Sequence, residues 1–370
     1  MTSNRRLVIR AGPTAARRLR EEGFHPDLFG TLVGASGGPK WLVLRALDDF
    51  WAERLLPARS RPLDALGSSI GSFRHACLGQ SHPLPALERF AESYVEQSYE
   101  DARPDPDVVT GESLRILDWM LGEKGAAEVA ENEVFRSHII ASRLRSTSTS
   151  TSTSTSTSTS TSTSSVDRGL AFQLRLGLAA GANLLTRRAL AGFFERGVFG
   201  PAQSAIRYSD FSTRYHTLDA DSLPLALSAS GSIPAVMAGV PRVGDAPGMW
   251  FDGGIIDYHF DFSFERAPGL VLFPHFFDRI IPGWFDKPLE WRRPALSNLD
   301  DVVMLAPSPE FVAALPGAHV PDRGDFVSMT NAERIRQWRG VLDHCRALVD
   351  DWCDLVDGGG LADAVRPFWD

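Results

Sequence analysis

The chain is poor in cysteine: its 370 residues include only three, Cys77, Cys345 and Cys353. Three cysteines cannot form a disulfide framework, and none of them belongs to a C-x-x-C pair. They are typical of a reducing compartment, so we expect a cytoplasmic protein. The sequence contains no H-E-x-x-H motif and no paired Cys/His ligands. We therefore expect no metal ion and no other cofactor.

The chain also lacks an excess of positive charge and a long hydrophobic run. Its net charge is -8, and nucleic-acid binding normally needs a concentrated basic face, so nucleic acid is not expected as a partner. No apolar stretch is long enough to span a membrane or to form the core of a signal peptide. We expect no transmembrane segment, and contact with a membrane surface only at the periphery of the protein.

Six arginines and no acidic residue occur among the first twenty residues. This bias has some similarity to an organellar transit peptide. A strand over residues 7 to 9, followed by a helix over residues 15 to 22 with a solvated basic face, explains it as well, and we favour that interpretation.

Strands and helices alternate along most of the chain, which indicates an α/β fold. Short buried strands are predicted at residues 29–33, up to Leu66, and at 249–251, 269–273 and 302–305. Residues 84–145 look mainly helical, with amphipathic segments at 84–99 and 112–121, and further helices are predicted at 170–194 and 333–356. We expect a three-layer α/β/α arrangement around a mainly parallel sheet. One domain over residues 1–320 would carry a C-terminal helical extension, residues 321–370, packed on it.

Residues 146 to 165 consist only of serine and threonine. The run has no apolar face that it could bury, so it is expected to be a disordered, solvated insertion in the domain.

Two glycine-containing loops follow two of the predicted strands. The first, Gly34-Ala35-Ser36-Gly37-Gly38-Pro39, precedes a helix. The second, Gly67-Ser68-Ser69-Ile70-Gly71, is a G-x-S-x-G sequence between a strand and a helix, the context in which that motif lifts a serine out of a strand end. Gly34 and Ser69 are 35 residues apart, about one βαβ unit, so neighbouring parallel strands would place the two loops side by side.

A third motif, Asp252-Gly253-Gly254, follows the apolar residues 249–251. An aspartate at a strand end can direct its carboxylate into a crowded site, because the two glycines after it take little space. Asp357-Gly358-Gly359 has the same sequence but follows a long predicted helix, where the glycines indicate the end of that helix. Asp252 is therefore the candidate functional residue.

The order of these motifs resembles that of the patatin-like phospholipase family of serine acyl hydrolases. The glycine loop matches the family pattern at Gly37, Gly38 and Lys40, but Ala35, Ser36 and Trp41 stand where the family has Asp, Gly and Gly. The other two motifs match at Gly67, Ser69 and Gly71, and at Asp252, Gly253 and Gly254. Residues 229–234, a small-residue segment that ends in proline, are also similar to the family. The resemblance covers roughly residues 29 to 260.

The resemblance implies a Ser-Asp dyad that hydrolyses lipid esters of the phospholipid or lysophospholipid class. Ser69 would attack the ester carbonyl, and Asp252 would accept its proton and later activate water. The backbone amides of Gly37 and Gly38 would form the oxyanion hole. A third amide would come from Lys40 or Ile70, because proline at position 39 has no N–H.

Two other interpretations remain open. In an α/β-hydrolase, the chain order Ser, acid, His would be met by Ser69, Asp252 and either His259 or His275. A catalytically silent patatin-like scaffold would explain the altered glycine loop. Residues 273–277 and 280–285 are rich in large apolar groups. They would line an acyl pocket, touch a lipid surface, or simply form a buried strand and its loop.

Overall fold

The computed structural model describes residues 5–101, 103–145 and 165–369. The predicted disorder of residues 146–165 therefore concerns residues that, apart from Ser165, lie outside the described part of the chain. Within the described residues no helix is long and apolar enough to cross a bilayer.

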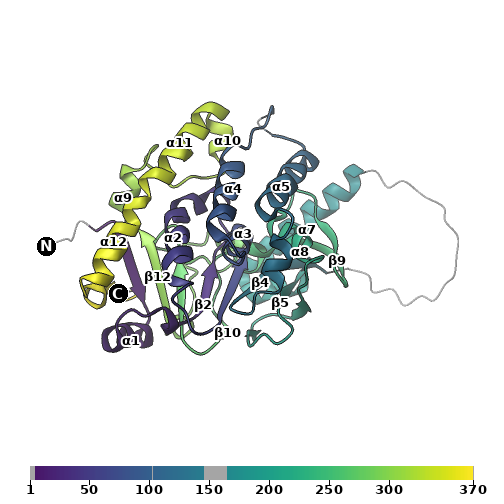
Figure 1. Ribbon diagram of the computed structural model, residues 1–370. Helices are drawn as coiled ribbons and strands as arrows, with labels where there is room; N and C mark the ends of the chain where they lie inside the picture. Colours follow the sequence, from purple (N-terminus) through teal and green to yellow (C-terminus); the bar gives the residue numbers. More distant parts are fainter. Residues whose placement is uncertain (1–4, 102, 146–164, 370) are drawn as a thin grey trace.

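One large mixed sheet forms the centre of the molecule (Figure 1). Its main path runs in the order β13-β1-β12-β11-β2-β3-β4-β5-β7, with β9 paired to β4 and β8 paired to β9. The strands are β1 (Leu7–Ala11), β2 (Phe29–Gly34), β3 (Leu63–Ser68), β4 (Phe135–Leu144), β5 (Phe194–Gly200), β7 (Thr213–Thr217), β8 (Val240–Val243), β9 (Ala246–Asp252), β11 (Leu270–Pro274), β12 (Val302–Pro307) and β13 (Val365–Arg366). Strands β6 (Arg207–Tyr208) and β10 (Phe264–Glu265) form a separate pair.

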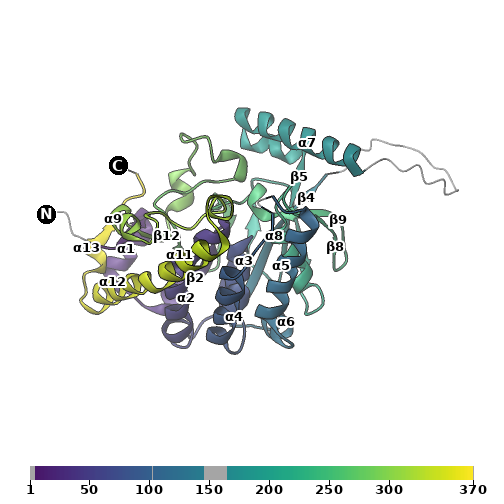
Figure 2. The ribbon, with the colours of Figure 1, turned by 90° about the horizontal axis from the view of Figure 1, so that it is seen from above.

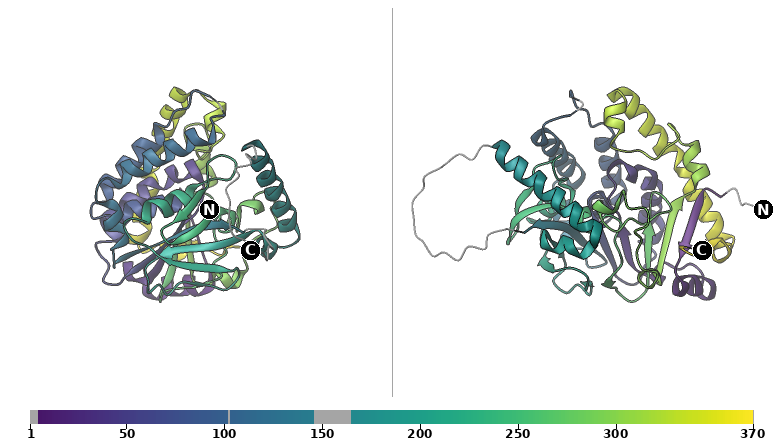
Figure 3. Two further views of the ribbon diagram at one scale, coloured as in Figure 1. Left: turned by 90° about the vertical axis from the view of Figure 1, so that its right-hand side faces the viewer. Right: turned by 180° about the vertical axis from the view of Figure 1, so that it is seen from behind.

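Helices cover both faces of this sheet (Figures 2 and 3). Helices α3, α4 and α5 lie on one face, whereas α7 lies on the other. The α-helices are α1 (Pro13–Glu22), α2 (Arg45–Phe50), α3 (Ile70–Leu78), α4 (Pro83–Val95), α5 (Pro106–Leu121), α6 (Gly125–Ala130), α7 (Ser165–Leu185), α8 (Leu223–Gly231), α9 (Pro309–Ala314), α10 (Asp325–Ser328), α11 (Asn331–His344), α12 (Arg346–Asp357) and α13 (Leu361–Ala364). The expected three-layer α/β/α architecture is confirmed.

Short 3-10 and π turns link these elements. They are η1 (Pro26–Leu28), η2 (Gly38–Leu44), η3 (Trp51–Leu55), η4 (Arg187–Gly192), η5 (Gly253–Ile255), η6 (Trp284–Asp286) and η7 (Leu296–Leu299). The helix expected after Pro39 is therefore a 3-10 turn, η2, that continues into α2.

The middle of the sheet is parallel and buried on both faces. Strands β12, β11, β2, β3 and β4 pair in parallel, and every residue of the first four is buried. Such strands read as continuous apolar runs rather than as alternating ones. This explains why β2, β3, β11 and β12 could be predicted from short hydrophobic runs.

Three of the predicted helices were wrong in extent. Residues 84–145 are not helical to the end, because 135–144 form β4, a central strand whose buried His138–Ala141 stretch has no two-residue alternation. The helix expected over residues 170–194 ends at Leu185, and β5 begins at Phe194. The long helix expected over residues 333–356 is two helices, α11 and α12, separated by a turn at Cys345 (φ -71°, ψ -8°).

Residues 321–370, expected as a helical extension, also contribute a strand: Ile9 in β1 lies opposite Val365 in β13, and the two strands run parallel.

Helix α3 packs against β2 at a point where two glycines meet. A Cβ atom added to Gly71 would lie 2.0 Å from the carbonyl oxygen of Gly34. The helix that follows the G-x-S-x-G sequence can therefore approach the strand before it only if position 71 has no side chain.

We predict that Gly71→Ala destabilises the protein by about 1–3 kcal/mol, because the new methyl group meets rigid backbone. Gly111→Ala is the matched control: Gly111 is also helical, in α5, and has no atom within 4 Å of an added Cβ. The control should stabilise the protein by about 0.5–1 kcal/mol through helix propensity. Denaturant unfolding measures both, and equal effects of the two substitutions would contradict the packing argument.

Candidate active site

Strand β4 brings the serine and the aspartate together because it is longer than its neighbour β3. Residues 135–140 of β4 pair with β3, and residues 141–143 pair with β9. Strand β9 therefore runs antiparallel along β4 and ends where β3 ends. Ser69 follows the last residue of β3, and Asp252 is the last residue of β9. The two motifs, more than 180 residues apart in the chain, meet at this point.

The hydroxyl of Ser69 donates a hydrogen bond of 2.6 Å to Oδ2 of Asp252. Both residues are almost buried, with exposed fractions of 5% and 7%. The other carboxylate oxygen, Oδ1, accepts a hydrogen bond of 2.7 Å from the amide of Gly254. The backbone thus fixes one carboxylate oxygen, and the other oxygen faces the proton of the serine hydroxyl.

The backbone of Ser69 has a conformation that a residue with a side chain rarely adopts, with φ 54° and ψ -127°. Its amide donates to Oγ of Ser230, which in turn donates to the carbonyl of Ile140 in β4. Ser230 lies in the small-residue segment predicted to pack beside the site. These contacts hold a sharp turn that lifts the Ser69 side chain out of the strand.

The glycine loop lies beside this turn, as the βαβ spacing predicted. Gly34 is the register partner of Gly67, so β2 and β3 end together. The hydroxyl of Ser36 donates 2.9 Å to that of Ser68 and ties the loop to the end of β3. Gly38 has a φ of +57°, a left-handed conformation that suits glycine.

Several amides near Ser69 are available to a ligand. Within the described residues, the amides of Gly37, Gly38 and Ile70 donate to no protein acceptor, whereas the amide of Lys40 donates to the carbonyl of Gly37 at 3.5 Å. Of the two residues considered for a third oxyanion donor, the geometry therefore favours Ile70, the first residue of α3.

The remaining predicted site residues support this geometry. A Cβ on Gly67 would lie 2.7 Å from Cα of Ser72, and one on Gly253 would lie 2.3 Å from the carbonyl of Ile140. The side chain of Lys40 forms an ion pair with Asp322.

A buried ion pair holds the turn that follows Asp252. The amide of Asp257 donates to the carbonyl of Gly253, and its carboxylate accepts two hydrogen bonds, of 2.6 and 2.8 Å, from the fully buried guanidinium of Arg196. Bidentate pairs of this kind fix orientation as well as position. Arg196 therefore supports the position of Asp252 indirectly, through Asp257.

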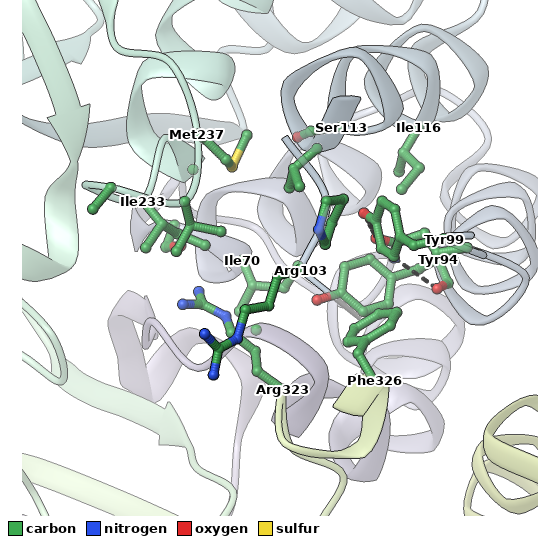
Figure 4. Close-up of a pocket in the computed structure, with 18 of the residues that line it drawn as sticks. Ile70, Tyr94, Tyr99, Arg103, Ser113, Ile116, Ile233, Met237, Arg323 and Phe326 are labelled. Carbon is green, nitrogen blue, oxygen red and sulfur yellow. Dashed lines mark hydrogen bonds between the residues drawn. The ribbon is translucent and has the colours of Figure 1, made fainter. Parts of the chain in front are cut away.

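Two cavities open beside the serine, and the larger of them is mainly apolar. The larger, of about 480 Å³, is lined by Ser69, Gly38 and Arg323 together with apolar residues of α4, α5 and α10 (Figure 4). The smaller, of about 20 Å³, contains Ser69, Asp252 and Gly37. Of the apolar residues 273–285, Trp284 lines the smaller cavity and none lines the larger one, so the wall of the large cavity was not predicted.

Burial and nearby cations act in opposite directions on the aspartate. Burial raises the pKa of Asp252 above its usual range, while the hydrogen bond from Ser69 and the positive charge of Arg323 lower it. The pKa of Lys40 and that of Lys287 both fall to about 8, first because the ammonium groups are buried and then because Arg323 repels them. Arg323 and Lys287 belong to no recognisable motif, so the sequence did not predict them as site residues.

The histidines of the alternative triad do not contact the dyad. Nδ1 of His259 accepts a hydrogen bond of 3.0 Å from the amide of Ile281, and Nδ1 of His275 lies against the carbonyl of Phe277. Neither ring makes a hydrogen bond to Ser69 or Asp252 among the described residues. Burial lowers the pKa of both rings, that of His275 to about 3.

Another serine does contact a histidine. Oγ of Ser204 lies 2.6 Å from Nε2 of His138, beside a cavity of about 70 Å³. Nδ1 of this ring meets the carbonyl of Arg136, not a carboxylate. Ser204 is not part of a G-x-S-x-G sequence, so the pair provides a useful internal control for tests of Ser69.

Comparison with known proteins adds no family assignment: neither a family model, nor a curated protein, nor a solved structure matches this chain. Within the described residues there is also no group of three or more histidine, cysteine or acidic side chains placed to hold a metal ion.

The strain at Ser69 leads to a first prediction for the site. Ser69→Gly should be more stable than Ser69→Ala by about 1 kcal/mol, because glycine relieves the positive φ whereas alanine keeps it. Both variants lack the hydroxyl, so the difference between their free energies of unfolding reports the backbone strain at position 69. Denaturant midpoints measure it, and a Ser69→Ala variant at least as stable as Ser69→Gly would contradict the strain.

The raised pKa of Asp252 leads to a second prediction, for Asp252→Asn. A carboxyl group whose pKa is raised on folding costs stability when it ionises, so stability is lost as the pH rises through the folded pKa. The variant should therefore be more stable than the native chain at pH 8, and this gain should vanish towards pH 4. Free energies of unfolding at the two pH values test this, and a gain that grows on acidification would contradict it.

Proposed function

We propose that the protein is a serine acyl-ester hydrolase that acts on lipid esters, of the phospholipid or lysophospholipid class, through a Ser69–Asp252 dyad. The observation that carries this proposal is the 2.6 Å hydrogen bond from Oγ of Ser69 to a buried carboxylate. A serine is a weak nucleophile until a base accepts its proton, and here the carboxylate already accepts a hydrogen bond from the serine hydroxyl.

The reaction would proceed in two halves. Ser69 attacks the ester carbonyl as its proton moves to Asp252, and the resulting tetrahedral intermediate expels the alcohol, which takes the proton from Asp252. Water then attacks the acyl-enzyme with Asp252 as the base, which releases the acid and restores the serine. No histidine takes part in either half.

The free amides of Gly37, Gly38 and Ile70 would stabilise the negative oxygen of each intermediate. One well-placed donor of this kind is typically worth ~3 kcal/mol of barrier. They come from two loops that the parallel pairing of β2 and β3 holds side by side. The altered residues of the glycine loop, Ser36 and Ala35, leave these three amides in place.

The shape of the larger cavity supports a lipid ester as substrate. It starts at Ser69 and is walled by Phe73, Ile116, Ile233 and Phe326, and its volume of about 480 Å³ lies in the range of ligand sites. An acyl chain would occupy this space while its carbonyl lies at the serine. The order of the three motifs, which resembles that of patatin-like hydrolases, points to the same chemistry.

The three cysteines are free, which supports a cytoplasmic location for this activity, and contact with a lipid surface would be peripheral.

Labelling with a fluorophosphonate probe tests the dyad. We expect the native protein to be labelled, Ser69→Ala to lose labelling entirely, and Asp252→Asn to lose it by about 10²–10⁴-fold, as the base is removed. Ser204→Ala should be labelled like the native protein, because its histidine contact lies outside the proposed site.

The same experiment separates the alternatives. A His259/His275 double alanine variant that folds but is not labelled would replace the dyad with a triad. No labelling of the folded native protein would favour the silent scaffold.

A further inference from the structure

One end of the large cavity, the end near Ser69, is basic. Arg323 lines both cavities, as does Ser69, so the guanidinium lies at the junction where the scissile ester would sit. Its Nε is 3.1 Å from the position of a Cβ atom added to Gly38. A second arginine, Arg103, lines the larger cavity from the segment between α4 and α5.

Figure 4 shows how these side chains divide the cavity. The guanidinium groups of Arg103 and Arg323 are directed to the side where Ile70 and Ile233 are drawn. The aromatic rings of Tyr94, Tyr99 and Phe326 occupy the other side. Because Ile70 follows Ser69 in the chain, the basic end is the end at the serine, and the apolar end is remote from it.

The acidic groups close to Arg323 are engaged elsewhere. Asp322 pairs with Lys40, and Asp325 accepts hydrogen bonds from the indole of Trp338 and from the ring of His319. Asp252 is held by Ser69 and Gly254. Among the described residues, neither Arg323 nor Arg103 forms an ion pair with any carboxylate, including that of Asp101 in the same cavity wall.

The ammonium group of Lys287 adds to the positive charge at this end. It lies 4.2 Å from the centre of the Tyr258 ring, and both residues line the smaller cavity with Arg323. The repulsion among Arg323, Lys40 and Lys287 has a cost that a bound anion would remove. A cluster of cations whose guanidinium groups form no ion pair among the described residues is suited to a phosphate or a carboxylate.

We propose that Arg323, assisted by Arg103, is the specificity-determining residue of this enzyme and binds an anionic group on the alcohol side of the substrate ester. This inference rests on the proposed function and extends it: the preferred substrates are acyl esters that carry a phosphate or carboxylate next to the ester, with the acyl chain in the apolar end. Arg323 belongs to the C-terminal residues, outside the part of the chain that carries the three motifs.

Three esters with the same octanoyl chain test the proposal and identify the anion. Octanoyl glycerol is neutral, octanoyl glycerol phosphate carries a phosphate, and the octanoyl ester of glycolate carries a carboxylate. We expect kcat/KM for at least one anionic ester to exceed that for the neutral ester by tenfold or more. The faster anionic ester shows whether phosphate or carboxylate is the bound group.

Substitutions at position 323 then test the residue. In Arg323→Gln the ratio of anionic to neutral kcat/KM should fall roughly tenfold to hundredfold, mainly through KM, because a charged hydrogen bond is lost. Arg323→Lys should restore only part of the ratio, since an ammonium group lacks the planar fork. Arg336→Gln removes the same charge from the same C-terminal part of the chain, outside the cavity, and should leave the ratio unchanged.

The outcomes separate the two proposals. Native protein that is labelled by fluorophosphonate but shows no preference for either anionic ester overturns the role of Arg323 and leaves the hydrolase in place. An Arg323→Gln variant that loses activity equally on all three esters also overturns it, because the residue would then be structural. Absence of labelling and of hydrolysis of every ester would reject the hydrolase itself.

Discussion

The proposed site depends on one structural constraint: strand β4 extends beyond β3, and β9 occupies the edge that β3 leaves free. This arrangement sets the end of β9 against the end of β3 and makes the hydrogen bond between Ser69 and Asp252 possible. Gly71 lets α3 pack on Gly34, and Gly253 fits against the backbone of β4, because neither position has a side chain. The parallel pairing of β2 and β3 then adds the glycine loop to the same corner.

The proposed site combines a buried carboxylate, Asp252, with nearby cationic side chains. Asp252 is buried, which raises its pKa and strengthens it as a base, while its hydrogen bonds and the nearby cations oppose protonation. Arg323 and Lys287 line the smaller cavity together with Asp252, so two cations face one carboxylate there. In this account the surplus positive charge selects the substrate, and the apolar end of the cavity holds its acyl chain.

Local sequence patterns predicted those parts of the fold and site that depend on neighbouring residues. The G-x-S-x-G and D-G-G turns, the buried strands β2, β3, β11 and β12, and the adjacency of the two loops follow from short motifs and from the rule for βαβ units. Strand β4 was missed, because a strand buried on both faces has no alternation to distinguish it from a helix. Arg323 and the wall of the large cavity could not be predicted, because they come from distant segments with no motif. The activity itself stays a prediction.

Peptide mapping of the fluorophosphonate adduct by mass spectrometry tests the central claim most directly. The account predicts that the adduct lies on Ser69, because this serine donates to a buried carboxylate and lies beside backbone amides that have no acceptor among the described residues. An adduct on another serine, such as Ser204 beside His138, would contradict it and would move the active site to a different part of the sheet.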